Sequence, residues 1–363
     1  LQKDGILFKM RRTQDLPDKE SATMFFQDCK LAHQAQITGI SHSVKEILPP
    51  DLLDLTQLQK EANIRYGYTA SEVYDIAQSL YEKKLISYPR TSSRYLTEDV
   101  FDSLSPIMTR LLSWELFPVA KGTGGIDISS LSRHVISAEK ANVHHAIIIT
   151  GIRPGNMSEK EMQVYRLVAG RMLEVFMAPC RIETTNVEAV CAAQHFKAEQ
   201  TRIIEAGWHD VFMHSDMIPT SGYSVKELPE VEKGDTLNVC GCNMVHKKHL
   251  PVDPFTDAEL VEYMELNGLG TVSSRTNIIR TLVNRKYIRY SGKYIVPTPK
   301  GMFTYETIRG KKIADTSLTA DWEKQLTGLE SGMITGQDFL NRIRTLAKEM
   351  TDDIFNTYST KEE

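Results

Sequence analysis

The sequence lacks any hydrophobic run long enough to cross a membrane. None of its apolar stretches approaches the roughly 20 residues that a spanning helix needs. It also lacks a charged start followed by an apolar stretch, so nothing indicates secretion. We therefore expect a cytoplasmic protein with no membrane partner. Because the first residue is leucine rather than methionine, we also expect the chain to be part of something longer.

Cysteine is scarce, and its placement argues against a metal site. The five cysteines are Cys29, Cys180, Cys191, Cys240 and Cys242. Only Cys240 and Cys242 are close in sequence, and no second pair lies nearby to complete a tetrahedral zinc site. An odd, scattered set fits reduced thiols in the cytoplasm. The sequence predicts no metal ligands in this chain.

Acidic residues are missing from one long window of a chain that is acidic overall. The formal net charge is -4, yet residues 267–304 contain no Asp or Glu. The same window holds seven cations, namely Arg275, Arg280, Arg285, Lys286, Arg289, Lys293 and Lys300. Tyrosines interleave with them, a combination that suits single-stranded nucleic acid. The simpler alternative is a solvated basic face whose tyrosines pack a small core.

Capping patterns and apolar periodicity predict a helical block between two strand-rich segments. Residues 1–60 and 183–204 have strand character, whereas Thr69, Ser158 and Thr256 each precede a glutamate by three residues, as in a capping box. A further helix is expected to run from Thr97 to Leu112. This order favours one β domain, made discontinuously, with the helical block inserted.

The last third predicts a helix followed by a hairpin. Apolar spacing indicates a helix over residues 273–286, and residues 287–296 form two short strand patterns around Ser291-Gly292. A helix followed by a hairpin is typical of winged-helix modules, which are common in DNA binding. Arg275 lies in the first turn of that helix, where free N–H groups already favour an anion.

Tyr88 and Arg90 form the most chemically suggestive pair. Pro89 disfavours helical backbone at Tyr88, so this tyrosine should lie on extended chain just after a helix. A phenol has a pKa near 10, so attack on a phosphodiester needs positive charge nearby. Arg90 supplies a planar, permanent charge, and Thr91 and Ser92 add hydroxyl donors. Taken alone, such a tripeptide is more often a turn than a nucleophile.

A histidine pair, His144-His145, precedes a short apolar run. Histidine near a phosphate can donate a hydrogen bond in either protonation state. Taken alone, however, such a pair is more often an ordinary surface or core feature. The Tyr88–Arg90 pair and the histidine pair therefore indicate a function only in combination with motifs elsewhere in the chain.

Four motifs, in order, resemble the type IA DNA topoisomerases, and among them the topoisomerase III-like branch. Residues 77–91 resemble the family's nucleophile motif, and residues 93–96 continue the match. Residues 144–148 are similar to its His-His-Ala-Ile-Ile-Pro-Thr motif. Residues 268–288 resemble its single-strand-binding helix, and Pro297, Thr298 and Gly301 follow at the expected place. The match spans at least residues 50–301.

The resemblance implies an α+β multidomain fold around a DNA-sized hole. We expect a β-rich arch or gate domain made in two passes, over residues 1–61 and 151–250. A winged-helix-like catalytic domain with the tyrosine would be inserted over residues 62–150. A C-terminal helical, winged-helix-like domain that binds single-stranded DNA would cover residues 251–363.

The resemblance also implies a mechanism. Tyr88 would attack single-stranded DNA and become linked to a 5′-phosphate, another strand would pass through the break, and the released 3′-hydroxyl would reseal it without ATP. Arg90 and His144 would act at the scissile phosphate. Thr91, Ser92, Arg275 and Arg280 would contact the substrate. The protein would be a monomer with DNA, mainly single-stranded, as its partner.

This sequence departs from the family in ways that matter. Ser92 stands where an acidic residue is usual, and Ile149 and Val272 replace prolines. The family's N-terminal domain, with the acidic cluster that binds Mg²⁺, has no counterpart here. We therefore expect no cofactor in this chain and little or no DNA relaxation by it alone. Two other readings remain: a non-cleaving module that binds single-stranded DNA, and a scaffold in which Tyr88 only packs.

Overall fold

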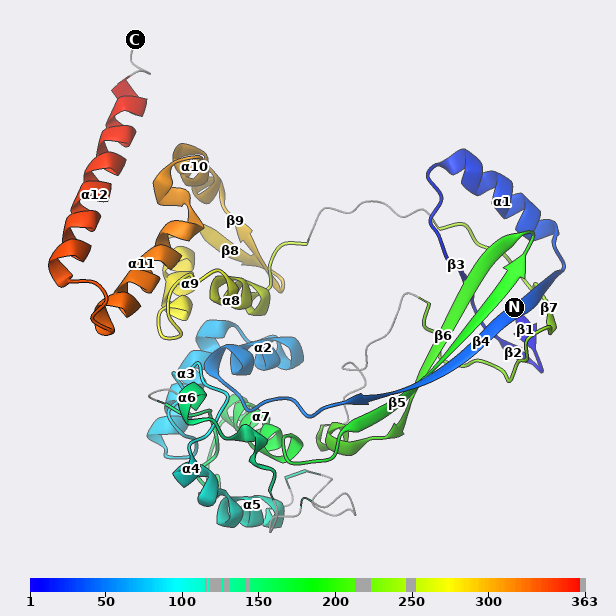
Figure 1. Cartoon of the computed structure of the whole chain (residues 1–363), viewed down its shortest axis with the longest axis horizontal. Helices are drawn as coiled ribbons and strands as arrows, with labels where there is room; N and C mark the ends of the chain where they lie inside the picture. Colours follow the sequence, from blue (N-terminus) through cyan, green and yellow to red (C-terminus); the bar gives the residue numbers. More distant parts are fainter. Residues whose placement is uncertain are drawn as a thin grey trace. The chain divides into compact units, whose positions relative to one another are not determined.

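The computed structural model describes residues 1–114, 116–117, 126, 131–141, 144–212, 223–245 and 253–359. The chain has an α+β fold and divides into two compact units (Figure 1). The β unit comprises Leu1–Pro50, Glu115–Asp127 and Leu173–Pro251. The helical unit comprises Asp51–Trp114, Ile128–Met172 and Val252–Glu363. The four-segment domain division expected from the sequence stays a prediction, and the compact units divide the chain at other positions.

One antiparallel sheet organises the β unit. Its strands in the described residues are β1 Gln2–Lys3, β2 Ile6–Leu7, β3 Arg11–Arg12, β4 Gln34–Ile47, β5 Cys180–Cys191, β6 Gln194–Glu205 and β7 Thr236–Asn238, in the order β2-β1-β7-β4-β5-β6-β3. The long strands β4, β5 and β6 form a twisted ribbon (Figure 1). The pairing of β4 with β5 joins segments that lie about 140 residues apart, as Ile40 opposite Val187 illustrates. The two strand-rich segments predicted from the sequence therefore share one sheet.

Exposed and buried side chains alternate where the sheet carries its core, as over residues 34–37 of β4, in keeping with the two-residue period of a strand. None of residues 38–47 of the same strand is buried. Its core consists of Phe8, Ile37, Val187, Ala189, Ala198 and Leu237. Helix α1, Lys19–Leu31, packs through Cys29 against Cys191 at the end of β5. Residues 1–60 contain β1 to β4, as their predicted strand character requires, but also α1, which the sequence patterns did not predict. Asp18 caps this helix by accepting a hydrogen bond from the Ser21 amide.

The helical unit contains α2 Leu55–Tyr66, α3 Ala70–Glu82, α4 Glu98–Asp102, α5 Leu104–Ser113, α6 Ala138–Ala141, α7 Glu159–Glu174, α8 Asp257–Leu266, α9 Arg275–Asn284, α10 Pro299–Ile308, α11 Thr316–Glu330 and α12 Gly336–Ser359, although the compact-unit boundary falls within α7. Short 3-10 turns lie at Arg133–Val135 and Lys312–Ala314, with a third, Gly207–Val211, in the β unit. The hairpin strands are β8 Ile288–Ser291 and β9 Tyr294–Pro297. The predicted helix and hairpin of the last third are confirmed, with the helix shorter at both ends.

The three capping boxes predicted from the sequence are confirmed. Thr69 and Glu72 exchange hydrogen bonds at the start of α3, and Thr256 and Glu259 do so at the start of α8. At α7 the Ser158 amide donates to Glu161 Oε2 over 3.0 Å, and the Glu161 amide donates to Ser158 Oγ over 3.3 Å. Local polar chemistry therefore sets where these helices begin.

Two helix predictions need correction. The helix expected from Thr97 to Leu112 is broken into α4 and α5 at Ser103. Pro106 accounts for the break, because it has no N–H to donate to the carbonyl of residue 102 and its ring crowds that carbonyl. Helix α2, which lies in the segment expected to form strands, begins at Asp54, whose Oδ1 accepts from the Gln57 amide over 2.7 Å. This N-cap is the signal that the strand interpretation missed.

A buried ion pair joins α2 to α7. Arg171 Nη2 lies 2.7 Å from Glu61 Oε1, and Arg171 Nη1 donates to the Asp51 carbonyl over 2.9 Å. Burial opposes the charge on Glu61, but the charges of Arg171 and Arg65 outweigh it, so the pKa of Glu61 lies below that of an ordinary glutamate. The pair stays ionised at neutral pH.

Replacing Arg171 with methionine should destabilise the helical unit by about 3 kcal/mol, because Glu61 then keeps its buried charge with only Arg65 beside it. Urea unfolding followed by helix circular dichroism measures the loss. Lys160→Met is the matched control on α7, since the Lys160–Glu72 pair is exposed and should cost less than about 1 kcal/mol. Equal losses in both variants would contradict the assignment.

Candidate active site around Tyr88

Tyr88 lies on extended chain that follows α3, as the sequence predicts. The flanking residues pair with a second extended segment from much later in the chain: Ile86 forms an antiparallel bridge with Ile149. The Ser87 amide donates to the Ile148 carbonyl over 2.8 Å, and the Ile148 amide donates to Ser87 Oγ over 3.0 Å. Both backbone groups are thereby satisfied, which holds the two segments in one register.

This register brings His144 onto Tyr88. The two ring centroids lie 4.5 Å apart with an angle of 47° between the ring planes. On another side Tyr81 makes an edge contact with Tyr88, at 5.4 Å and 78°. Tyr88 is half-buried and His144 is exposed. The phenol is therefore held in place by neighbouring rings while part of it remains in contact with solvent.

Arg90 lies against α3. Its guanidinium carbon lies 4.9 Å from the centroid of the Tyr74 ring, and Nη2 donates to Gln78 Oε1 over 3.2 Å. The buried Nε has no hydrogen-bond partner among the described residues. Stacking on an aromatic face holds a guanidinium in a fixed orientation. Arg90 thus supplies an oriented positive charge two residues from Tyr88 with donor capacity left over.

Thr91 makes hydrogen bonds within the protein, and its expected contact with substrate stays a prediction. The side chain is buried, with Oγ1 donating to the His144 carbonyl over 2.9 Å and accepting from the Ser93 amide over 3.0 Å. This geometry fits a residue that positions His144. Ser92, by contrast, is exposed, and its expected contact with substrate stays a prediction.

The two arginines expected to bind substrate on α9 both meet acidic side chains. Arg280 Nη2 lies 2.9 and 2.8 Å from the two carboxylate oxygens of Asp75, and its Nε donates to Ser71 Oγ over 2.7 Å. Arg275 is buried, with Nη1 lying 3.6 Å from Glu265 Oε1, and burial lowers its pKa. The structure thus joins both arginines to neighbouring helices, and their contact with nucleic acid stays a prediction.

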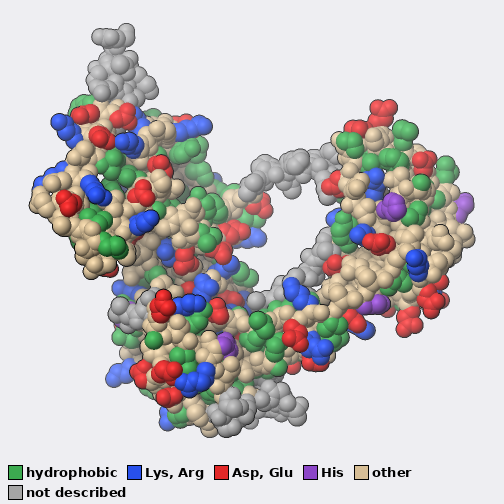
Figure 2. Space-filling view, in the orientation of Figure 1, with side chains coloured by type: hydrophobic (Ala, Val, Ile, Leu, Met, Phe, Trp, Pro, Cys, Tyr) green, Lys and Arg blue, Asp and Glu red, His purple; other side chains and the backbone are tan. Residues whose placement is uncertain are grey.

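The other five cations of the acid-free window are exposed, and they lie in the turn after α9, on the hairpin and on α10: Arg285, Lys286, Arg289, Lys293 and Lys300. Two of them stack on tyrosines, Lys293 on Tyr294 at 5.2 Å and Lys300 on Tyr287 at 4.3 Å. Tyr290 has a packing role instead, since its hydroxyl donates to Asp257 over 2.7 Å. Figure 2 shows Lys and Arg interspersed with acidic side chains over the face it draws, in keeping with the small net charge.

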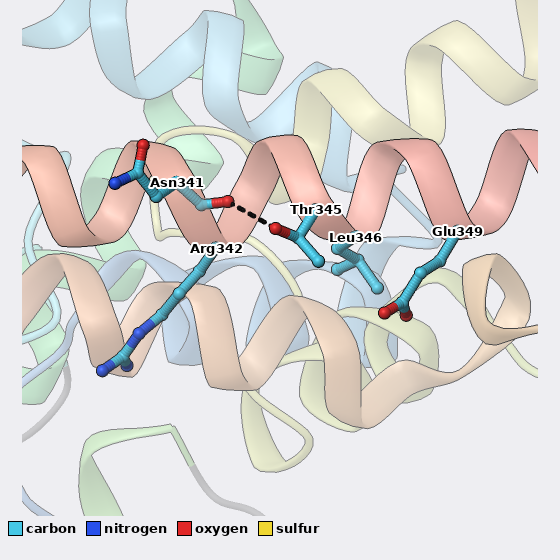
Figure 3. A pocket seen from close by; sticks show the side chains of 5 residues that line it. All are labelled: Asn341, Arg342, Thr345, Leu346 and Glu349. Carbon is cyan, nitrogen blue, oxygen red and sulfur yellow. Dashed lines mark hydrogen bonds between the residues drawn. The ribbon is translucent and has the colours of Figure 1, made fainter.

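The described residues contain no group of three or more His, Cys, Asp or Glu side chains that could hold a metal ion. Over the same residues, no helix has the length and apolar character to cross a membrane. A shallow hollow of about 360 Å³ lies along α12, where Thr345 donates to the Asn341 carbonyl (Figure 3). None of the site residues expected from the sequence lines it.

The comparisons with known proteins agree with the motifs. The DNA topoisomerase family model matches residues 2–341. The chain belongs to the DNA topoisomerase family. It is 31% identical to DNA topoisomerase 3 of Bacillus licheniformis over 88% of this chain and 47% of that protein. It is 30% identical to DNA topoisomerase 3 of Shouchella clausii over 97% of this chain and 51% of that protein.

The resemblance to type IA, topoisomerase III-like proteins is therefore confirmed. The chain spans about half the length of the curated relatives it matches. The fold is shared with full-length topoisomerase I from Thermotoga maritima, with a TM-score of 0.71 and 22% identity over 94% of this chain and 56% of that one. At this identity the likeness speaks for the fold alone.

Replacing Thr91 with valine should destabilise the helical unit by about 1–2 kcal/mol, because the His144 carbonyl and the Ser93 amide lose a shared partner. Urea unfolding measures this loss. Thr109→Val is the control, since the Thr109 hydroxyl only bonds one carbonyl on the exposed surface of α5. If both variants unfold at the same urea concentration, Thr91 does not hold the His144 segment.

Proposed function

We propose that this chain is the strand-cleaving part of a type IA DNA topoisomerase and that Tyr88 is its nucleophile. Membership of the family supports the reaction class. The observation that carries the choice of residue is the contact of the half-buried Tyr88 ring with the exposed imidazole of His144, whose centroids lie 4.5 Å apart. Arg90, two residues further along the chain, is held in a fixed orientation on the Tyr74 ring.

The proposed step is a transesterification. The Tyr88 oxygen attacks a phosphorus of single-stranded DNA, loses its proton, and forms a bond to the 5′-phosphate. The bond from phosphorus to the 3′-oxygen breaks, and that oxygen takes up a proton to become a free hydroxyl. After another strand has passed, the hydroxyl attacks the phosphotyrosine and restores the original bond. One ester replaces another, so no ATP is required.

The neighbours of Tyr88 would stabilise the charge that develops. Arg90 would donate N–H groups to the non-bridging phosphate oxygens, and a permanent charge in a partly buried site stabilises the transition state more than the ground state. His144 would hydrogen-bond the same phosphate. The contact of its ring with the Tyr88 ring supports this assignment. Thr91 would act on His144 rather than on the DNA.

The exposed cations that follow α9 and those of the β8–β9 hairpin would bind the backbone of the single strand. Arg275 and Arg280 are assigned to the strand by resemblance, but their acidic neighbours leave the exposed cations as the first contacts. We also propose the fold expected from the resemblance, with a β-rich arch and winged-helix-like domains around a DNA-sized hole.

We further propose that the protein is a monomer and is located in the cytoplasm.

Magnesium does not fit the described residues of this chain, since they hold no suitable group of acidic, histidine or cysteine ligands. We propose that Mg²⁺ binds another part of the whole protein, and no step above passes through it. The runner-up function is a module that binds single-stranded DNA without cutting it. The exposed Ser92, in place of an acidic residue, is the observation that favours this second function.

With the full-length protein and Mg²⁺, Tyr88→Phe should abolish covalent attachment of single-stranded DNA, because the attacking oxygen is gone. The assay follows a strand labelled at its 3′ end, since the fragment that carries the 5′-phosphate is the one that stays on the protein. A strand labelled at its 5′ end should instead yield a free, shorter fragment.

Tyr66→Phe is the matched control, because it removes a phenol oxygen at the end of α2 in the same unit. It should leave the adduct unchanged. A wild-type protein that binds DNA but yields no adduct would favour the non-cleaving module. An adduct that survives Tyr88→Phe would remove Tyr88 from the mechanism.

Arg289→Ala should weaken binding of a fluorescent single strand by this chain and lower the salt slope of the binding constant by about one, because one phosphate contact is lost. Titrations at several salt concentrations measure both quantities. Arg309→Ala, an exposed arginine beside Glu306, should leave the slope unchanged. An unchanged slope in Arg289→Ala would place the strand elsewhere on the protein.

A further inference from the structure

Asp54 is a buried carboxylate that the proposed chemistry does not use. Only 1% of its surface is exposed. One oxygen accepts from the Gln57 amide at the start of α2, over 2.7 Å. The other accepts from Arg94 Nε, also over 2.7 Å. Burial of a charge is costly unless it is paired and hydrogen-bonded, so both contacts are needed to keep this carboxylate in place.

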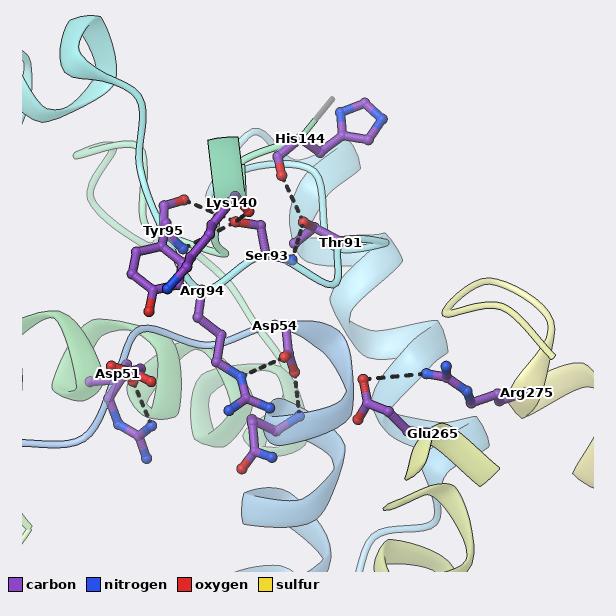
Figure 4. A network of polar contacts seen from close by, with 12 residues as sticks. Asp51, Asp54, Thr91, Ser93, Arg94, Tyr95, Lys140, His144, Glu265 and Arg275 are labelled. Carbon is purple, nitrogen blue, oxygen red and sulfur yellow. Dashed lines mark hydrogen bonds and ion pairs between the residues drawn. The ribbon is translucent and has the colours of Figure 1, made fainter. Parts of the chain in front are cut away.

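The residue next to Asp54 holds the same loop. The Leu55 amide donates to the Thr91 carbonyl over 3.1 Å. Together, Asp54 and Leu55 bind both ends of residues 91–94, the loop that follows Tyr88. On its other side this loop is bound by Thr91 to His144 and by Ser93 Oγ to the Lys140 carbonyl over 2.7 Å (Figure 4). The start of α2 is thus one of two supports of the nucleophile loop.

Asp54 also belongs to a row of alternating charges that reaches α9. Figure 4 shows two ion pairs, with Arg94 directed at Asp54 and Arg275 directed at Glu265. The negative charges of Asp54 and Glu265 both act on each of the two arginines. The loop after Tyr88 is bound to the start of α2, and α2 is bound to α9, since Gln59 Nε2 donates to Thr276 Oγ1 over 2.9 Å, all within one compact unit.

We propose that Asp54 is a positioning residue for strand cleavage. Its carboxylate holds Arg94, and with it the Tyr88 loop, at a fixed distance from α9. This inference rests on the proposed function, in which Tyr88 attacks a strand bound by α9 and the hairpin. An error of about 1 Å in the placement of a nucleophile can lower a rate about a hundredfold, so a support of this kind acts on the rate of cleavage rather than on DNA affinity.

Asp54→Asn separates the two roles of the carboxylate. Asparagine caps a helix as well as aspartate does, so α2 should still begin at the same residue. The amide carries no charge, and Arg94 loses its ion pair. In the full-length protein with Mg²⁺ we expect adduct formation at saturating single-stranded DNA to slow roughly tenfold to a hundredfold. The dissociation constant for the strand and the melting temperature should change little.

Glu98→Gln is the matched control, because it breaks an exposed carboxylate–arginine pair, with Arg133, in the same unit. It should leave the cleavage rate unchanged. Arg94→Gln removes the other partner of the Asp54 pair and should slow cleavage as Asp54→Asn does. If Asp54→Asn fails to fold, Arg94→Lys decides the matter, because lysine keeps a positive charge beside the buried carboxylate but not the planar guanidinium that fixes the loop, and it should also slow cleavage. The double variant should be no slower than the slower single one.

The outcomes are distinct. If the wild-type protein forms no adduct, the proposed function fails and this inference fails with it. If the wild type forms an adduct and both single variants cleave at its rate, the inference alone is overturned. It is overturned as well if affinity and rate fall together in both variants, since a general loss of folded protein would produce that result.

Discussion

The pairing of two extended segments, residues 85–91 and 144–149, is the constraint on which the rest of the site depends. Neither segment is a regular strand of a sheet, so their backbone groups find partners partly in each other and partly in neighbouring loops, as where the Ile147 amide donates to the Leu53 carbonyl over 2.8 Å. The hydrogen bonds between Ser87 and Ile148 and between Thr91 and His144 join the two segments at two separate points. A slip of one residue would turn every side chain to the opposite side. Tyr88 would then no longer meet His144.

The helices around these segments hold them from several directions. The start of α2 binds the loop after Tyr88 through the Leu55 amide and the Asp54 carboxylate. Helix α3 supplies the ring and amide that orient Arg90. Helix α7 is joined to α2 by the buried Arg171–Glu61 pair. The reactive groups lie on non-helical chain, but their positions are set by the ends and faces of helices, which are the stiffer elements.

The polar contacts between α3 and α9 affect which cations can bind DNA in the proposed function. Arg280 donates hydrogen bonds to Asp75 and Ser71. Both residues lie on α3, the helix that precedes Tyr88. The sequence alone suggests that Arg280 is available to bind DNA, but its side chain takes part in the packing of α9 against α3. The cations left exposed are those of the hairpin and its flanks, where tyrosine rings lie beside Lys293 and Lys300.

The sequence by itself determined the local features: the three capping boxes, the hairpin, the extended chain at Tyr88 and the family, because each depends on neighbouring residues or on ordered motifs. The sequence patterns missed α1, α2 and the break at Ser103. At each of these places a single capping residue or proline set the structure against the pattern of the longer segment. Only the tertiary structure decided which polar side chains are engaged. Thr91, Asp54 and Arg280 each meet partners dozens to hundreds of residues away, and no local pattern encodes such contacts.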